Sequence, residues 1–138
     1  MTAKVFLDSS YAIAVSSPRD QHHAHALRLA DRFEAARTPM ITTRAVMLEI
    51  GNAFARASRR AAGMALLDLL ERDPDVEIVT LSEDLYRQGA ELYRKHRDKN
   101  WGMTDCISFV VMHRRGLQHA LTSDDHFRQA GFRALLTE

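Results

Sequence analysis

Short apolar runs alternate with segments of helical periodicity along the whole chain. The apolar runs resemble strands in length and composition, and they cover residues 4–7, 40–42, 76–81, 119–122 and 132–136. Helices are expected at residues 9–15, 20–37, 43–58, 61–72, 82–96, 104–115 and 124–130. Strands that alternate with helices in this way are typical of an α/β sandwich around a mainly parallel sheet. We therefore predict this fold class.

The length of 138 residues fits one domain that spans residues 1–138. The formal net charge of +1 does not indicate a nucleic-acid binder, although it leaves room for a local basic patch. Cys106 is the only cysteine, so no intramolecular disulfide can form, which fits a reducing compartment. The N-terminus lacks the apolar region of a signal peptide, and no apolar stretch reaches the roughly 18 residues of a membrane-spanning helix. The expected location is the cytoplasm.

Four acidic residues lie where a carboxylate is hard to explain as ordinary surface. They are Asp8, Glu49, Asp105 and Asp124. Asp8 and Asp124 follow predicted strands, and the C-terminal ends of parallel strands form the functional crevice of an open sheet. Glu49 lies inside the apolar stretch 45–50. Because acidic side chains are rarely buried unless they are paired or bind a metal, we predict that the four converge on one cation site.

The residue types at this predicted site indicate the chemistry. Carboxylate oxygens favour Mg²⁺ or Mn²⁺ over zinc, which prefers nitrogen and sulfur ligands. One Mg²⁺ ion usually takes one or two carboxylates, so four acids leave room for two ions. Two ions roughly 3.5–4 Å apart clamp the attacking and leaving oxygens of an in-line displacement at phosphorus. The expected reaction is therefore phosphodiester hydrolysis by activated water, without a side-chain nucleophile.

Neighbouring polar side chains are candidates to orient the carboxylates and bound water. Asn52 follows Glu49 by three residues and Ser108 follows Asp105 by three, so each pair shares a helix face. The full set of candidate supporting residues is Ser9, Asn52, Ser108, Thr122 and Asp125. Plainer interpretations stand beside these: the acids as helix caps or turn residues, and the amide and hydroxyl groups as solvent-facing.

Four sequence segments, in order and sensibly spaced, cover nearly the whole chain. They read Val-Phe-Leu-Asp-Ser-Ser at 5–10, Leu-Glu-Ile-Gly-Asn at 48–52, Thr-Asp-Cys-Ile-Ser-Phe at 104–109, and Ala-Leu-Thr-Ser-Asp-Asp-His-Phe at 120–127. The last segment contains the pattern Thr-x-Asp-x-x-Phe and is followed by Ala-Gly-Phe at 130–132. Together they resemble PIN-domain nucleases, and most closely the VapC-like toxins of bacterial type II toxin–antitoxin pairs.

The resemblance implies a PIN-like three-layer sandwich, with a mainly parallel five-stranded sheet flanked by helices. It implies that Asp8, Glu49, Asp105 and Asp124 bind Mg²⁺ or Mn²⁺, with Asp125 as the alternative to Asp124. The implied activity is metal-dependent endonucleolytic cleavage of single-stranded RNA, leaving a 5′-phosphate and a 3′-hydroxyl. Toxin members commonly form homodimers and are silenced by a cognate antitoxin that covers the acidic site.

Two residues are candidates for contact with RNA. Arg44 precedes Glu49 by about one and a half helical turns and is the candidate phosphate-binding cation. Trp101 lies in the polar loop before Asp105, where its ring is a candidate to stack on a base. The alternative interpretation of Trp101 is a partly buried packing residue. Whether transfer, ribosomal or messenger RNA is cut stays open.

Other residues are expected to be structural. His22, His23 and His25 lack the convergent ligand set of a zinc site, and we expect His126 and the apolar-helix residue Cys106 to have structural roles. A phosphoryl-accepting receiver domain also gathers acids for Mg²⁺, but it needs a lysine late in the chain, and Lys99 is the last one. A PIN-type RNA-binding or RNA-processing module without a toxin role remains the alternative function.

Overall fold

The computed structural model describes residues 3–138. Its centre is a five-stranded sheet in the order β3-β2-β1-β4-β5, in which every neighbouring pair is parallel. The strands are β1 (Val5–Leu7), β2 (Met40–Thr43), β3 (Val76–Val79), β4 (His119–Leu121) and β5 (Arg133–Ala134). The expected five-stranded sheet is therefore confirmed, and it is parallel throughout.

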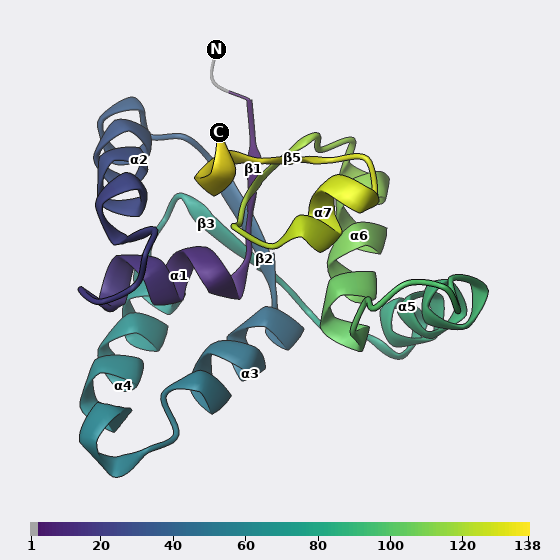
Figure 1. The fold of residues 1–138 in the computed structure, drawn as a ribbon, viewed down its shortest axis with the longest axis horizontal. Helices are drawn as coiled ribbons and strands as arrows, with labels where there is room; N and C mark the ends of the chain where they lie inside the picture. Colours follow the sequence, from purple (N-terminus) through teal and green to yellow (C-terminus); the bar gives the residue numbers. More distant parts are fainter. Residues whose placement is uncertain (1–2) are drawn as a thin grey trace.

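Helices cover both faces of this sheet. They are α1 (Ser9–Ser16), α2 (His23–Ala36), α3 (Arg44–Ala53), α4 (Ala57–Arg72), α5 (Glu83–Lys95), α6 (Met103–Arg115), α7 (Asp125–Gln129) and the 3₁₀ helix η1 (Leu135–Thr137). Figure 1 shows α1, α2 and α4 on one side of the sheet and α5, α6 and α7 on the other. The predicted three-layer sandwich is confirmed. Within residues 3–138, no helix combines the length and apolarity that crossing a membrane requires.

Two expected helix boundaries are wrong. The helix expected at 43–58 ends at Ala53, and the next one begins at Ala57 rather than at residue 61. Phe54 causes the break, because its side chain is buried in the turn between α3 and α4. Gly63 of α4 packs so closely on Phe54 that a Cβ at Gly63 would lie 2.5 Å from the Phe54 Cβ. This tertiary contact folds α4 back onto α3 without a proline or glycine in the turn.

Further boundaries also differ, and the strand expected at 76–81, for example, ends at Val79. The helix expected at 20–37 begins at His23, because Asp20 first accepts hydrogen bonds from the backbone N–H groups of His22 and His23. The strand expected at 132–136 pairs only through Arg133–Ala134 and then turns into η1. These differences leave the layers and the strand order unchanged.

The core lies between the sheet and the two helical layers. Val5, Phe6 and Leu7 of the central strand β1 are all buried, as expected for a parallel strand covered on both faces. Phe109 of α6 packs edge-on against Phe127 of α7, with ring centroids 5.0 Å apart. These aromatic contacts fix α6 and α7 relative to each other, and both helices carry predicted site residues.

Candidate active site

The topology brings the four predicted carboxylates to one edge of the sheet. The C-terminal ends of β1 and β4 lie side by side because their last residues are in register. Helices α1, α3 and α7 directly follow β1, β2 and β4, and they begin near this edge (Figure 1). Asp8 is the N-cap residue of α1 and Asp124 that of α7. Asp105 lies in the first turn of α6 and Glu49 lies in α3.

Asp8 is a buried carboxylate held by hydroxyl groups. Its side chain is at the protein interior, with only 3% of the residue exposed. Its Oδ2 atom accepts hydrogen bonds from Thr122 Oγ1 at 2.7 Å and from Ser10 Oγ at 3.0 Å. The pKa of Asp8 is raised from 3.8 to about 7. Burial is the main cause and the charges of Glu49 and Asp105 add to it, whereas the hydrogen bonds from Thr122 and Ser10 act in the opposite direction. Asp8 thus lacks a compensating positive charge among the described residues.

Glu49 is joined to the same edge through α1. Ser9 Oγ donates a hydrogen bond to Glu49 Oε1 at 2.5 Å, which ties the first turn of α1 to the middle of α3. Met47 and Ile50, on either side of Glu49, are buried in the core, whereas Leu48 is exposed. The carboxylate therefore lies at the inner border of α3, where its charge acts on Asp8.

Asp105 and Asp124 share one histidine. Asp105 Oδ2 accepts hydrogen bonds from the Gly102 backbone N–H and from His126 Nδ1, each at 3.0 Å. The same Nδ1 atom lies 3.2 Å from Asp124 Oδ1, which also accepts the His126 backbone N–H at 2.9 Å. Because an ionised carboxylate only accepts hydrogen bonds, this arrangement places the ring proton on Nδ1. One ligand atom from each of the three residues lies within 4.8 Å of the others.

The pKa of Asp105 is raised, first by burial and also by the charge of Asp124, whereas the hydrogen bonds from Gly102 and His126 lower it. A hydroxyl joins the two halves of the site, since Thr122 Oγ1 donates to Asp8 and accepts the Asp124 backbone N–H at 3.0 Å. The four acids thus form one connected electrostatic group. Such a group favours a bound cation, because mutual repulsion and burial both penalise the ionised carboxylates.

Among the candidate supporting residues, Ser9 and Thr122 bond directly to carboxylates. Within residues 3–138, no hydrogen bond joins Asn52, Ser108 or Asp125 to a predicted carboxylate. Ser108 donates back to the Thr104 carbonyl within α6, a bond that helical serines commonly form. Asp125 is exposed and paired with Arg128, and Asn52 is exposed on α3.

The two candidate RNA contacts are also placed differently from expectation. Arg44 forms an ion pair with Glu71 of α4 on the surface. Trp101 is only 7% exposed, and its Nε1 donates to Gln129 Oε1 at 3.0 Å. Its ring packs edge-on against Phe109 at 5.0 Å between centroids. The packing interpretation of Trp101 is therefore the one that the structure supports.

Ser10 and His126 are site residues that the sequence interpretation missed. Ser10 Oγ donates to Asp8, lies 3.0 Å from Thr122 Oγ1 and accepts the Ser123 backbone N–H at 3.1 Å. Both residues lie two positions after a predicted carboxylate, at the start of a helix, and that spacing was the available signal. The other histidines serve elsewhere: His23 Nδ1 bonds to the Ala14 carbonyl at 2.7 Å.

The family described as PIN domain matches residues 5–133. The chain belongs to the PIN domain family. This PIN domain is 32% identical over 132 residues to the 23S rRNA-specific endonuclease VapC20 of Mycobacterium tuberculosis, covering 93% of this chain and 95% of that protein. The crystal structure of Mycobacterium tuberculosis VapC20, described as a Sarcin-Ricin loop cleaving toxin, matches with a TM-score of 0.81 and 26% identity over 94% of this chain and 96% of that one.

A second solved structure extends the likeness of fold. DNA-bound VapBC from Salmonella typhimurium matches with a TM-score of 0.66 and 14% identity, covering 97% of each chain. The donor set of this PIN domain fits a divalent cation, because it combines convergent carboxylate oxygens with a buried acid whose pKa is raised. Asp105 and Asp124 are the residues best placed to hold such an ion.

Proposed function

We propose that this PIN domain is a Mg²⁺- or Mn²⁺-dependent endoribonuclease and the toxin of a toxin–antitoxin pair. The observation that carries the proposal is the convergence of Asp8, Glu49, Asp105 and Asp124 at one edge of the sheet. All four are proposed to hold the metal, with Ser9, Ser10, Thr122 and His126 orienting them. The likeness to an rRNA-specific endonuclease over 93% of the chain supports RNA as the substrate.

The side chains at the site favour water as the nucleophile. Ser9 and Ser10 both donate their hydroxyl protons to carboxylates, which keeps them as orienting groups. Cys106 is buried, and burial raises the pKa of its thiol to about 11. When bound, a divalent ion neutralises phosphate charge and lowers the pKa of water. The carboxylates would hold this ion, and they can accept a proton from the attacking water. In-line attack of water at phosphorus breaks the bond to the 3′-oxygen, which takes up a proton, and leaves a 5′-phosphate and a 3′-hydroxyl.

The proposed substrate class is ribosomal RNA, on the strength of the relative's specificity. The test is to incubate the purified protein with total bacterial RNA and sequence the new ends, with Mg²⁺, with Mn²⁺ and with EDTA. Cuts in 23S rRNA that require a divalent ion would support the proposal. Ion-independent cuts, or none in any RNA, would contradict it. Cuts confined to precursor RNA would favour an RNA-processing role.

We also propose a cytoplasmic protein partner, the antitoxin, and a homodimer. Large apolar side chains are exposed on the α3–α4 pair, and Leu48, adjacent to Glu49, is 64% exposed. Met64 and Leu69 of α4 are also more than half exposed. Exposed apolar groups of this kind favour a protein interface. Size-exclusion chromatography with light scattering tests the dimer on the protein alone, and it tests the complex after co-expression with any small gene found directly beside this one.

Mg²⁺ or Mn²⁺ is expected to stabilise the folded protein. A ligand at 100 times its dissociation constant that binds only the folded state adds about 2.7 kcal/mol. For a domain of this size, the melting temperature should rise by roughly 10 °C. Differential scanning fluorimetry with and without each ion measures the shift. A wild-type protein whose melting temperature responds to neither ion would count against the metal site.

His126 is expected to act as a positioning residue for Asp105 and Asp124. His126→Ala should weaken divalent-ion binding by about 10–100-fold, because hydrogen-bonding partners of metal ligands commonly have this effect. Isothermal titration calorimetry measures the affinity. His126→Asn is the matched variant, since its amide can place an N–H donor near the position of Nδ1 and should recover part of the loss. Equal affinities for the Ala variant and wild type would rule out the positioning role.

A further inference from the structure

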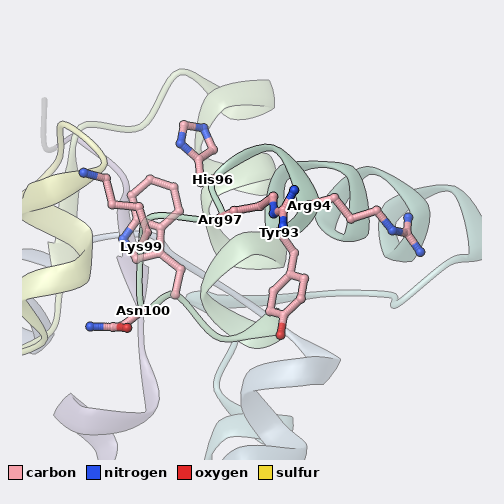
Figure 2. A pocket seen from close by; sticks show the side chains of 7 residues that line it. Tyr93, Arg94, His96, Arg97, Lys99 and Asn100 are labelled. Atoms are coloured by element: carbon pink, nitrogen blue, oxygen red, sulfur yellow. The ribbon is translucent and has the colours of Figure 1, made fainter.

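A basic hollow lies where α5 ends and the loop to α6 begins (Figure 2). Its volume is about 870 Å³. Its lining residues come from one continuous stretch of chain: Tyr93, Arg94, His96, Arg97, Lys99, Asn100 and Trp101. None of these residues is acidic, so the hollow presents cationic groups with no carboxylate in its own lining.

The positive charge of the basic hollow is largely free of ion pairs. Within residues 3–138, neither Arg94 nor Arg97 forms an ion pair, and Lys99 approaches only its neighbour Asp98, at 3.5 Å. By contrast, Arg114 at the end of α6 is paired with Asp84 at 2.7 Å. The hollow therefore keeps a positive potential that attracts phosphate groups.

The floor of the basic hollow is rigidly packed. The ring of Trp101 lies 4.8 Å from that of His96 between centroids, and its indole nitrogen bonds to Gln129 of α7. Below the floor, α5 and α6 approach closely, because a Cβ on Gly89 would lie 2.6 Å from Ile107 Cγ1. Packing of Trp101 therefore holds in place the loop that carries Arg97 and Lys99.

The basic hollow and the carboxylates belong to the same continuous piece of structure. Trp101 precedes Asp105 by four residues, so their Cα atoms are at most about 15 Å apart. Gln129, which holds Trp101, lies on α7, and Asp124 is the N-cap residue of that helix. A short stretch of nucleic acid is long enough to occupy both places at once.

We propose that the basic hollow binds the phosphate backbone of single-stranded RNA beside the bond that is cut. This inference rests on the proposed ribonuclease function. Arg94 and Arg97 supply fork-shaped donors that match phosphate oxygens, and Lys99 adds a third cation. Tyr93 is 51% exposed and offers a ring face to a base. Cations combined with aromatic faces are the usual means of binding single strands without sequence preference.

RNA is favoured over an acidic protein segment because Trp101, in the lining of the hollow, lies only four residues before Asp105, whose carboxylate belongs to a site that suits phosphodiester chemistry. In this proposal the basic hollow takes the place of Arg44 and Trp101, the substrate contacts expected from the sequence. Arg44 is paired with Glu71, and Trp101 serves as the floor rather than as a stacking ring. Recognition of the backbone here would leave sequence choice to other contacts.

The test measures RNA binding by the double variant Arg94→Ala/Arg97→Ala. The reference protein and both double variants carry Asp105→Asn, so that the single-stranded oligonucleotide is not cut. Binding is measured by the fluorescence anisotropy of the fluorescein-labelled oligonucleotide over a range of salt concentrations. Loss of two phosphate contacts should weaken binding about tenfold and lower the slope of log affinity against log salt by about 1.4. The control is Arg28→Ala/Arg32→Ala on α2, which removes equal charge from the opposite side of the molecule (Figure 1).

The possible results separate this inference from the proposed function. If the Arg94/Arg97 variant binds like the control variant, the inference is overturned, while ion-dependent RNA cleavage by the wild type would still support the nuclease. Equal losses in both variants would also overturn it, since only net charge would then matter. If the wild type cuts no RNA but the Arg94/Arg97 variant alone loses binding, the hollow stands and the nuclease does not. Matching melting temperatures exclude misfolding.

Discussion

Replacing Asp105 by Asn is expected to lower RNA cleavage by about a thousandfold or more. The substitution keeps the size of the side chain but removes the charge that holds a divalent ion, and such ions stabilise the transition state by several kcal/mol. The Asp105 carboxylate accepts hydrogen bonds from Gly102 and His126, and the charge of Asp124 acts on it. Initial rates on a labelled RNA at saturating Mg²⁺ measure the effect.

The matched control for this prediction is Asp125→Asn. Asp125 adjoins Asp124 in sequence, but its carboxylate is exposed and bonds to Arg128. We expect nearly wild-type cleavage from this control. An Asp125→Asn protein as inactive as Asp105→Asn would show that Asp125, rather than Asp124, serves the reaction. A fully active Asp105→Asn protein would contradict the metal-binding role proposed for Asp105.

Asp8→Asn is expected to change how stability depends on pH when no divalent ion is present. The pKa of Asp8 is about 7 in the folded protein and 3.8 when exposed, so the folded state binds more protons between these values. The free energy of unfolding should therefore fall as pH rises from about 4 to about 7, and level off above that. The difference corresponds to at most roughly 4 kcal/mol.

Urea unfolding in EDTA across this pH range tests the prediction. Asp8→Asn should be the more stable protein near pH 8 and should lack most of the decline, because its amide oxygen can still accept from Thr122 and Ser10. Asp68→Asn on the exposed face of α4 is the control and should keep the wild-type decline. If the free energy of unfolding of Asp8→Asn fell as much as that of the wild type, another titratable group would be responsible for the decline.

The sequence was sufficient to predict that Asp8 and Asp124 lie at the same edge of the sheet, and the reason is topological. Asp8 and Asp124 directly follow strands that the apolar pattern reveals, and parallel strands end at one edge. Asp105 lies in the first turn of α6, close to the same edge. These placements depend on the order of elements alone, so no knowledge of side-chain packing was needed.

The directions of individual side chains could not be predicted in this way. Arg44 turns to Glu71, which lies 27 residues further along the chain and meets it only when α4 folds back on α3. That reversal itself depends on Phe54 packing against Gly63, without a local turn signal. His126 is similar, because its ring finds Asp105 only through the docking of α7 on α6.

The hydrogen bond that Thr122 donates to Asp8 joins two parts of the polypeptide that are 114 positions apart in sequence. A growing chain emerges with Asp8 well before Thr122, Asp124 and His126. A chain that ends before these residues therefore lacks part of the proposed active site. Activity can therefore appear only after the segment from Asp105 to His126 has been synthesised and has folded beside β1.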